Sequence, residues 1–278
     1  MSATDAALSF LILILVSFVP ALVYLSWVRR TERYQTEAWG PLLRAFFYGA
    51  LFATFIAALV EAIILGLGDA VSSTYPGPEF IFLNSSSTAG AFFLVLVVAP
   101  FVEEALKGSG VVASRRYLRF IADGPVFGAA VGLGFGFFET FLYGLGAWIV
   151  GGIAAGIALI LLRSVSSVLL HGSSTGMFGY GYARHRFGAP GAGTGTYYLV
   201  AVGMHSAFNA IASLPLLLAL IGITGIALTL GSGVALLIAV LFAFVAIQHV
   251  RDVIQASNYP ALRSGPARYA PRPPPGPS

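Results

Sequence analysis

Several ionisable side chains lie inside or at the ends of long apolar runs in this sequence. At the centre of a membrane-spanning helix each such group costs roughly 3 kcal/mol, so the whole set facing lipid would cost on the order of 10 kcal/mol. These side chains must therefore face one another or water, as they would in a reaction centre inside a membrane. The residues are Glu103, Glu104, Lys107, Glu139, His171 and His205.

The first acidic motif reads Glu103-Glu104-Ala-Leu-Lys107. Residues three and four apart are neighbours on a helix, so Lys107 can pair with either acid. Adjacent carboxylates point about 100° apart, so we expect one acid to look into a cavity while the other holds the site together. The alternative for this motif is an ion pair at a helix end, near the membrane surface.

Two further acids lie in apolar segments. Glu139 needs a cation or hydrogen-bond donors to hold its charge there, so we expect a partner for it. The alternative is a neutral glutamate bonded to a neighbouring helix. Glu61 has no partner at neighbour spacing, and we expect it to bond to Arg44 or to another helix without assigning it to catalysis.

The two histidines each belong to a polar helix face. Arg163, Ser167 and His171 repeat every fourth residue, and His205 and Asn209 are also four apart. Taken singly, each histidine fits a hydrogen bond between helices better than it fits a metal site.

The set taken together points to a different chemistry. Glu103, Glu139, His171 and His205 fall on four separate predicted helices, and two imidazoles with carboxylates have the composition of a three-ligand hydrolytic metal site. The chain has 0 cysteines, so carboxylate and imidazole are its only strong metal ligands. No local His-Glu-x-x-His spacing occurs, so the fold must bring the ligands together.

The composition is that of a multi-pass protein of the cell membrane. Of the 278 residues 58% are hydrophobic and 9% are charged, and the mean hydropathy is +0.87. The basic residues lie in short loops and in the C-terminal tail and form no face that could bind nucleic acid. The lipid bilayer is therefore the expected surrounding, and the oligomeric state is left open.

We expect an all-α bundle of about seven transmembrane spans. Arginine clusters follow the first, third, fifth and last span, which places the N-terminus outside and the C-terminus in the cytoplasm. An eighth span results if Gly146–Leu162 crosses; we prefer a tilted extension of the fifth helix or a surface segment, because only an odd count puts all clusters on one side. The predicted spans are Ala6–Val28, Pro41–Gly66, Ala89–Ala113, Pro125–Gly146, Ala154–Tyr182, Tyr197–Leu217 and Ile221–His249.

This pattern gives a transmembrane domain over residues 1–250, whose core at 89–217 contains the polar residues described above. Residues 251–278 are rich in Pro and Arg and predict a disordered cytoplasmic tail. Many of the 33 glycines fall in the core, which indicates close contact between helix backbones.

The ordered motifs resemble those of the PrsW family of intramembrane metalloproteases, whose patterns are EExxK, FExxxY, a histidine in a following helix, and HxxxN or HxxxD. Here they read Glu103-Glu104-Ala-Leu-Lys107, Phe138-Glu139-Thr-Phe-Leu-Tyr143, His171 and His205-Ser-Ala-Phe-Asn209. The family is more distantly similar to CAAX prenyl endopeptidases and bacteriocin-processing enzymes. The resemblance implies a peptidase that cuts membrane-anchored proteins such as anti-sigma-factor-type regulators.

The resemblance also implies roles for the residues. Glu103 would be the general base, Glu104 and Lys107 would orient it, and Asn209 would donate to the oxyanion. A divalent metal, expected to be zinc, would be ligated by Glu139, His171 and His205. In the wider superfamily the same positions can be read without a metal, as a glutamate and a histidine activating water and the last His and Asn forming an oxyanion hole.

Two other classes of function remain open at this point. A transporter or channel could use buried Glu, Lys and His as ion or proton sites, and a scaffold could use them only to join helices. The peptidase requires these side chains to converge on one point, whereas transport does not.

Overall fold

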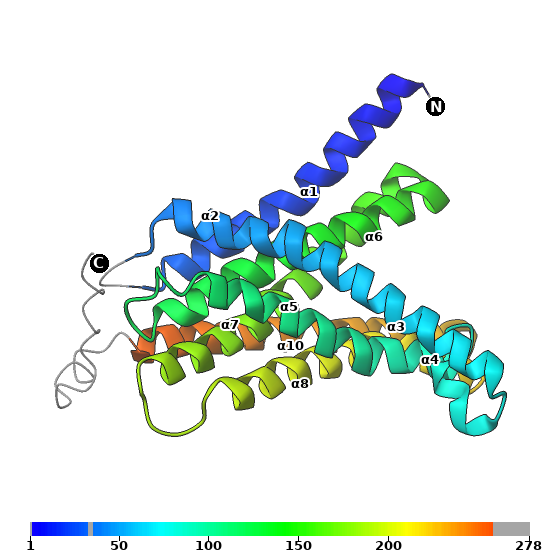
Figure 1. The fold of residues 1–278 in the computed structure, drawn as a ribbon. Coiled ribbons are helices and arrows are strands. Elements are labelled where there is room, and N and C mark those ends of the chain that lie inside the picture. Colours follow the sequence, from blue (N-terminus) through cyan, green and yellow to red (C-terminus); the bar gives the residue numbers. More distant parts are fainter. Residues whose placement is uncertain (1, 33–35, 258–278) are drawn as a thin grey trace.

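The structure is a computed structural model that describes residues 2–32 and 36–257. The described residues form helices and short connections, without strands (Figure 1). The elements are α1 (Ala3–Arg29), α2 (Trp39–Phe47), η1 (Tyr48–Ala53), α3 (Thr54–Thr74), η2 (Pro78–Leu83), α4 (Thr88–Phe93), η3 (Leu94–Val98), α5 (Ala99–Ala113), α6 (Asp123–Ser164), α7 (Ser167–Arg186), α8 (Thr194–Ala212), α9 (Leu214–Leu220) and α10 (Gly225–Ser257).

The all-α, multi-pass architecture expected from composition is confirmed. Within the described residues, 5 helical runs are long and apolar enough to cross a membrane, or 6 if α8 and α9, which meet at 46°, form one span. The run Asp123–Arg186 passes this test as a single unit although it folds back on itself. The predicted number of about seven spans and the predicted orientation stay predictions.

The fold-back occurs at Gly152, whose φ of 79° and ψ of 174° break α6 into two legs. Residues that lie about equally far before and after Gly152 in the sequence contact each other: Gly144 faces Ile160, and Gly132 faces His171. The returning leg and α7 therefore both run antiparallel to the first leg. The stretch Gly146–Leu162 forms the tip of this hairpin, and its returning part leads into α7 after a break at Ser166.

Glycines line the interface inside the hairpin. Gly124, Gly128, Gly132 and Gly136 recur every fourth residue on α6, and each faces α7. A Cβ atom at Gly132 would lie 2.0 Å from the carbonyl oxygen of His171, far inside contact distance. The expected close backbone packing is confirmed, and it fixes the position of His171 directly.

The opposite side of α6 packs in the same way against the first half of the chain. A Cβ atom at Gly134 would lie 1.9 Å from the carbonyl oxygen of Phe46 in α2, and one at Gly49 in η1 would lie 2.0 Å from that of Val131. Large apolar side chains such as Phe127 and Leu133 are fully buried between these helices. The first leg of α6 is thus the central helix that positions its neighbours.

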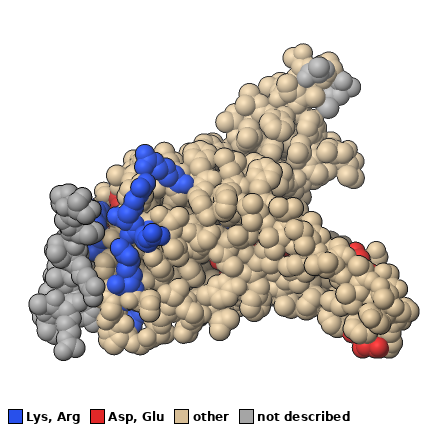
Figure 2. Space-filling view, in the orientation of Figure 1, with Lys and Arg blue, Asp and Glu red and all other residues tan. Residues whose placement is uncertain are grey.

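Arg side chains gather at one end of the molecule, the end where α10 finishes and away from the N-terminus (Figures 1 and 2). α10 continues past residue 250, the predicted end of the transmembrane domain, to Ser257. The reason is that Arg251 is anchored: its Nε donates to the Thr31 hydroxyl at 2.9 Å and its guanidinium lies 4.2 Å from the Trp27 ring centroid. The predicted disordered tail otherwise lies outside the described residues.

At the opposite end the molecule is deeply hollowed between two arms (Figure 2). One arm is made by α1 and the tip of α6, and the other by α3, η2 and α4 (Figure 1). Phe55 of α3 packs on Phe138 of α6 with ring centroids 5.5 Å apart, a spacing typical of aromatic pairs. Further along the two helices Leu59, Ile63 and Leu142 are exposed.

Candidate active site

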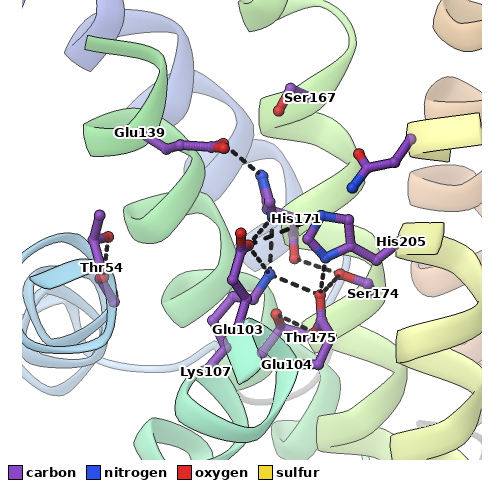
Figure 3. A network of polar contacts seen from close by, with 12 residues as sticks. Thr54, Glu103, Glu104, Lys107, Glu139, Ser167, His171, Ser174, Thr175 and His205 are labelled. Carbon is purple, nitrogen blue, oxygen red and sulfur yellow. Dashed lines mark hydrogen bonds and ion pairs between the residues drawn. The ribbon is translucent and has the colours of Figure 1, made fainter. Parts of the chain in front are cut away.

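Three donor side chains from three helices meet inside the bundle (Figure 3). Glu103 comes from α5, His171 from α7 and His205 from α8, and all three are buried. Their candidate ligand atoms lie within 4.8 Å of one another. Glu103 Oε2 is 4.0 Å from His171 Nδ1 and 3.9 Å from His205 Nε2. The required convergence of these residues is thus present.

Lys107 lies at the base of this group and is fully buried. Its Nζ is 2.7 Å from Glu104 Oε1 and 3.6 Å from Glu103 Oε2, so the predicted pairing with either acid occurs with both. Nζ also lies 2.8 Å from His171 Nδ1 and 4.5 Å from the Phe135 ring centroid. An ammonium group can only donate, so Nδ1 is the acceptor and the proton of a neutral His171 is on Nε2.

Glu104 is the acid that holds the site together. Its Oε1 accepts hydrogen bonds from Lys107 Nζ, from the Ser174 hydroxyl at 2.9 Å and from His205 Nδ1 at 3.1 Å. The Thr175 hydroxyl donates to Oε2 at 3.3 Å. This carboxylate joins α5, α7 and α8, and the donation from Nδ1 leaves His205 Nε2 turned toward Glu103.

Glu139 has the cationic partner that its apolar surroundings require. Its Oε2 accepts hydrogen bonds from Arg163 Nη2 at 2.7 Å and from His171 Nε2 at 2.8 Å. Arg163 also donates to the Ser167 hydroxyl at 2.9 Å and lies 4.0 Å from the Tyr143 ring centroid. The sequence places Arg163, Ser167 and His171 on one stripe, but the bond from Arg163 to Glu139 depends on the hairpin and was not predicted.

Each histidine is therefore held by a carboxylate at one ring nitrogen. The other nitrogen of His205 turns toward Glu103, whereas that of His171 accepts the hydrogen bond from Lys107, which it would have to release to bind a metal, and lies 4.0 Å from Glu103. Glu139 holds Nε2 of His171, and Glu104 holds Nδ1 of His205. Carboxylates that accept the second N–H of a histidine commonly fix the orientation of metal-ligating imidazoles. Glu103 therefore forms the group with the two histidines, whereas Glu139 contacts His171 at the opposite ring nitrogen, Nε2.

The residues present suit a divalent metal. Glu103 Oε2 is a buried oxygen without a hydrogen-bond partner among the described residues, and two imidazole nitrogens face it. In the ionised network the carboxylates of Glu103, Glu104 and Glu139 outnumber the cations Lys107 and Arg163, so an excess of negative charge remains. Nitrogen and carboxylate donors with this charge are the set that zinc prefers.

Asn209 does not reach this group. Its Nδ2 donates to the backbone carbonyl of Val95 in η3 at 2.8 Å. Its role as an oxyanion donor stays a prediction.

Glu61 approaches the site from α3. Its Oε1 is buried without a hydrogen-bond partner among the described residues, and its carboxylate interacts electrostatically with Glu139 and Lys107. Arg44 instead donates to the Tyr117 hydroxyl at 2.9 Å, so it is not the partner of Glu61. In the sequence, the signal for Glu61 is an acid inside an apolar run with no charged residue three or four positions away.

Comparison with known proteins gives one family. The model of the PrsW family of intramembrane metalloproteases matches residues 37–248, which is most of the chain and includes every residue of the site. No curated protein and no solved structure matches the chain.

Proposed function

Because the chain belongs to the PrsW family of intramembrane metalloproteases, we propose that it hydrolyses peptide bonds of membrane-anchored proteins at the Glu103–His171–His205 group. The protein is a multi-pass membrane protein. The observation that carries the proposal is the convergence of these three side chains from separate helices, with a buried carboxylate oxygen that has no hydrogen-bond partner among the described residues and lies near two oriented imidazoles. Neither a transporter nor a scaffold requires this arrangement.

Glu103, His171 and His205 would hold a divalent metal, which we propose to be zinc. When bound, such a metal lowers the pKa of water and polarises a peptide carbonyl. The ligand set expected from the motifs contained Glu139 in place of Glu103. We assign Glu139 to orienting His171, since it accepts the Nε2 proton of that ring.

The remaining steps belong to the protein's own groups. Glu103 Oε2 accepts no hydrogen bond from the described residues. The Glu103 carboxylate would therefore receive the proton of the attacking water, the role expected from the motif. Its carboxylate has two oxygens, so it can face a metal and a water together. Glu104 and Lys107 fix its surroundings through the contacts at 2.7 and 3.6 Å.

The substrate would enter from the bilayer. The side chains of Glu139 and Arg163 are 19% and 18% exposed, more than Glu103 at 10%, which makes their side of the site the open one. A peptide lying in the hollow between the two arms would approach from that side (Figure 2). A membrane-anchored regulator of the anti-sigma-factor type fits such entry, because its chain is already in the membrane.

The arrangement of the basic end supports the orientation derived from the sequence. We propose seven crossings, counting the two legs of the Asp123–Arg186 hairpin separately and α8 with α9 as one. The end that carries the Arg side chains would face the cytoplasm, and the N-terminus would lie outside (Figure 2).

The test is cleavage of a membrane-anchored reporter by the purified protein in liposomes, with metal content measured on the same samples. We expect Glu103→Gln and His205→Ala to abolish cleavage and to lower bound zinc, while the exposed-loop control Glu79→Gln changes neither. Cleavage that persists in Glu103→Gln would exclude its role. Cleavage lost with zinc fully retained would make Glu103 a base alone and return the third-ligand position to Glu139.

A further inference from the structure

The helical segment before Glu103 contains an irregularity with an identifiable cause. η3 is a π-helix over Leu94–Val98, in which each N–H bonds to the carbonyl five residues earlier, and the Ala99 N–H bonds to Leu94 O. In this register the carbonyl of Val95 should receive the N–H of residue 100. That residue is Pro100, which has no N–H to donate.

Asn209 supplies the missing donor. Its Nδ2 lies 2.8 Å from Val95 O, so a side chain of α8 completes the backbone hydrogen bonding of η3. The bond lies at an exposed apolar surface of the bundle, where lipid offers no hydrogen bonds, so leaving the carbonyl unsatisfied would be costly.

The same face of α8 contacts this segment at two more points. The Tyr198 hydroxyl donates to Phe101 O at 2.9 Å, and its ring packs edge-on against Phe101 with centroids 6.2 Å apart. Between Tyr198 and Asn209, His205 reaches Glu104 at 3.1 Å. This face of α8 therefore bonds to the backbone before and after Pro100 and to the acid pair that follows it.

The π-segment determines where the acid pair points. A π-bulge inserts one extra residue into a helix, and one residue corresponds to a rotation of about 100°. Glu103 follows the bulge by one turn. Reversion of η3 to a regular α-helix would therefore rotate Glu103 away from His171 and His205.

We propose that Asn209 is a positioning residue: by bonding to the carbonyl that Pro100 leaves free, it holds the π-segment and keeps Glu103 directed at the two histidines. This assignment replaces the oxyanion role expected from the motif. It rests on the proposed peptidase function for its kinetic readout, whereas the bond itself can be tested without activity.

The test is a cycle of Asn209→Ala, Pro100→Ala and the double variant, assayed for reporter cleavage per folded molecule. Asn209→Ala should lower the rate by about 10- to 100-fold, as for other groups that orient a metal site. Pro100→Ala provides an N–H for Val95 O and should keep most of the rate. In the double variant that N–H replaces the lost amide, so the rate should recover to within about threefold of Pro100→Ala.

Other results of the cycle would overturn the assignment. If the double variant is as slow as Asn209→Ala while Pro100→Ala is active, Asn209 acts on the substrate and the oxyanion role is restored. Full activity of Asn209→Ala would remove both roles. A matched control is Asn84→Ala, because Asn84 bonds only within its own loop, where its Oδ1 accepts the Ser86 N–H at 3.0 Å; it should leave the rate unchanged.

Hydrogen exchange keeps the proposal testable if Pro100→Ala does not fold or if the wild-type protein cleaves no reporter. Asn209→Ala should exchange backbone amides faster over residues 94–104, with α10 unchanged. Exchange over residues 94–104 equal to that of the wild type would show that the amide does not hold the segment. A failure of the peptidase function would instead appear as an inactive wild-type chain with the exchange difference still present.

Discussion

Among residues 2–32 and 36–257, two buried groups of three donor residues occur, and they differ in the hydrogen bonds that their oxygens accept. The reaction group is Glu103, His171 and His205; the second group, here called the end cluster, is Glu32, Glu37 and Asp123. In both, the candidate ligand atoms lie within 4.8 Å of one another. Distance alone therefore does not separate a candidate reaction centre from a structural contact.

Hydrogen bonding separates them. In the end cluster Glu32 Oε2 accepts the Glu37 N–H at 3.1 Å, and Glu37 Oε1 accepts Arg119 Nη2 at 2.8 Å. Asp123 Oδ2 accepts the N–H groups of Arg119 and Phe120. These acids tie together the connections after α1 and α5, and no imidazole is among them. The reaction group has two oriented imidazoles and a carboxylate oxygen that accepts no hydrogen bond from the part of the chain that the structure describes, which suits it to an added ligand.

The largest expected contrast lies in the cations of the two groups. Lys107→Met leaves Glu103 and Glu104 buried without their cation and should destabilise the protein by about 3–5 kcal/mol. Arg119→Met removes a cation whose own side chain is 43% exposed but leaves Glu37, 4% exposed, without it, so the loss should be smaller, about 1–3 kcal/mol. Thermal unfolding in detergent measures both, and equal losses would contradict the comparison.

The reaction group should also depend more on close helix packing. Gly132→Ala places a Cβ atom against the His171 carbonyl and should cost about 1–3 kcal/mol and reduce cleavage. Gly146→Ala, in the same helix with open space around it, should be neutral or stabilising by about 0.5–1 kcal/mol. Unfolding and cleavage of the two variants side by side check this, and a harmless Gly132→Ala would show that the hairpin can relax.

One glutamate beside the reaction group and one within the end cluster give a further contrast in activity. Glu139→Gln keeps the shape of the side chain but weakens its hold on His171, so cleavage should fall about 10- to 100-fold. Glu37→Gln in the end cluster should leave cleavage within twofold. The measurement is the initial rate on the membrane-anchored reporter, corrected for folded protein. A Glu37→Gln variant as slow as Glu139→Gln would link the end cluster to catalysis.

A final contrast is a pH dependence that belongs to the end cluster. Burial, with the nearby charges of Asp123 and Glu37, raises the pKa of Glu32 to about 9. The folded state then holds a proton that the unfolded state has lost above its ordinary pKa of 4.5, so stability should fall as pH rises from about 5 to about 9. Glu32→Gln, which cannot titrate, should remove this slope, which is about 1.4 kcal/mol per pH unit within that range. Melting temperatures at several pH values test it, and a slope unchanged by Glu32→Gln would assign the titration elsewhere.

Much of the architecture followed from composition and motif order. Apolar runs predicted a multi-pass helical protein. The peptidase interpretation predicted that Glu103, Glu139, His171, His205 and Asn209 converge, and the first four are linked in the structure whereas Asn209 bonds to Val95. The pairing of Lys107 with both acids followed from helical spacing alone. These features depend on solvation and helix periodicity, which are local properties of a sequence.

The features that could not be predicted depend on single backbone conformations. The bond from Arg163 to Glu139 exists because the chain reverses at Gly152, and one glycine among many gave no sign of a positive φ. The bond from Asn209 to Val95 exists because η3 is a π-helix, and periodicity does not distinguish that from an α-helix. Pro100, which removes the regular donor, is the signal that could have directed attention there.

The symmetry of contacts about Gly152 bears on how the protein is made. Glu139, Arg163 and His171 all belong to one continuous stretch, so half of the polar centre can assemble as soon as this stretch has entered the bilayer, before α8 has left the ribosome. Their charges are then matched early, and the partly synthesised chain avoids exposing them to lipid. Insertions at the hairpin tip would preserve this pairing, whereas one extra residue in either leg would turn every later side chain by about 100° and separate the partners.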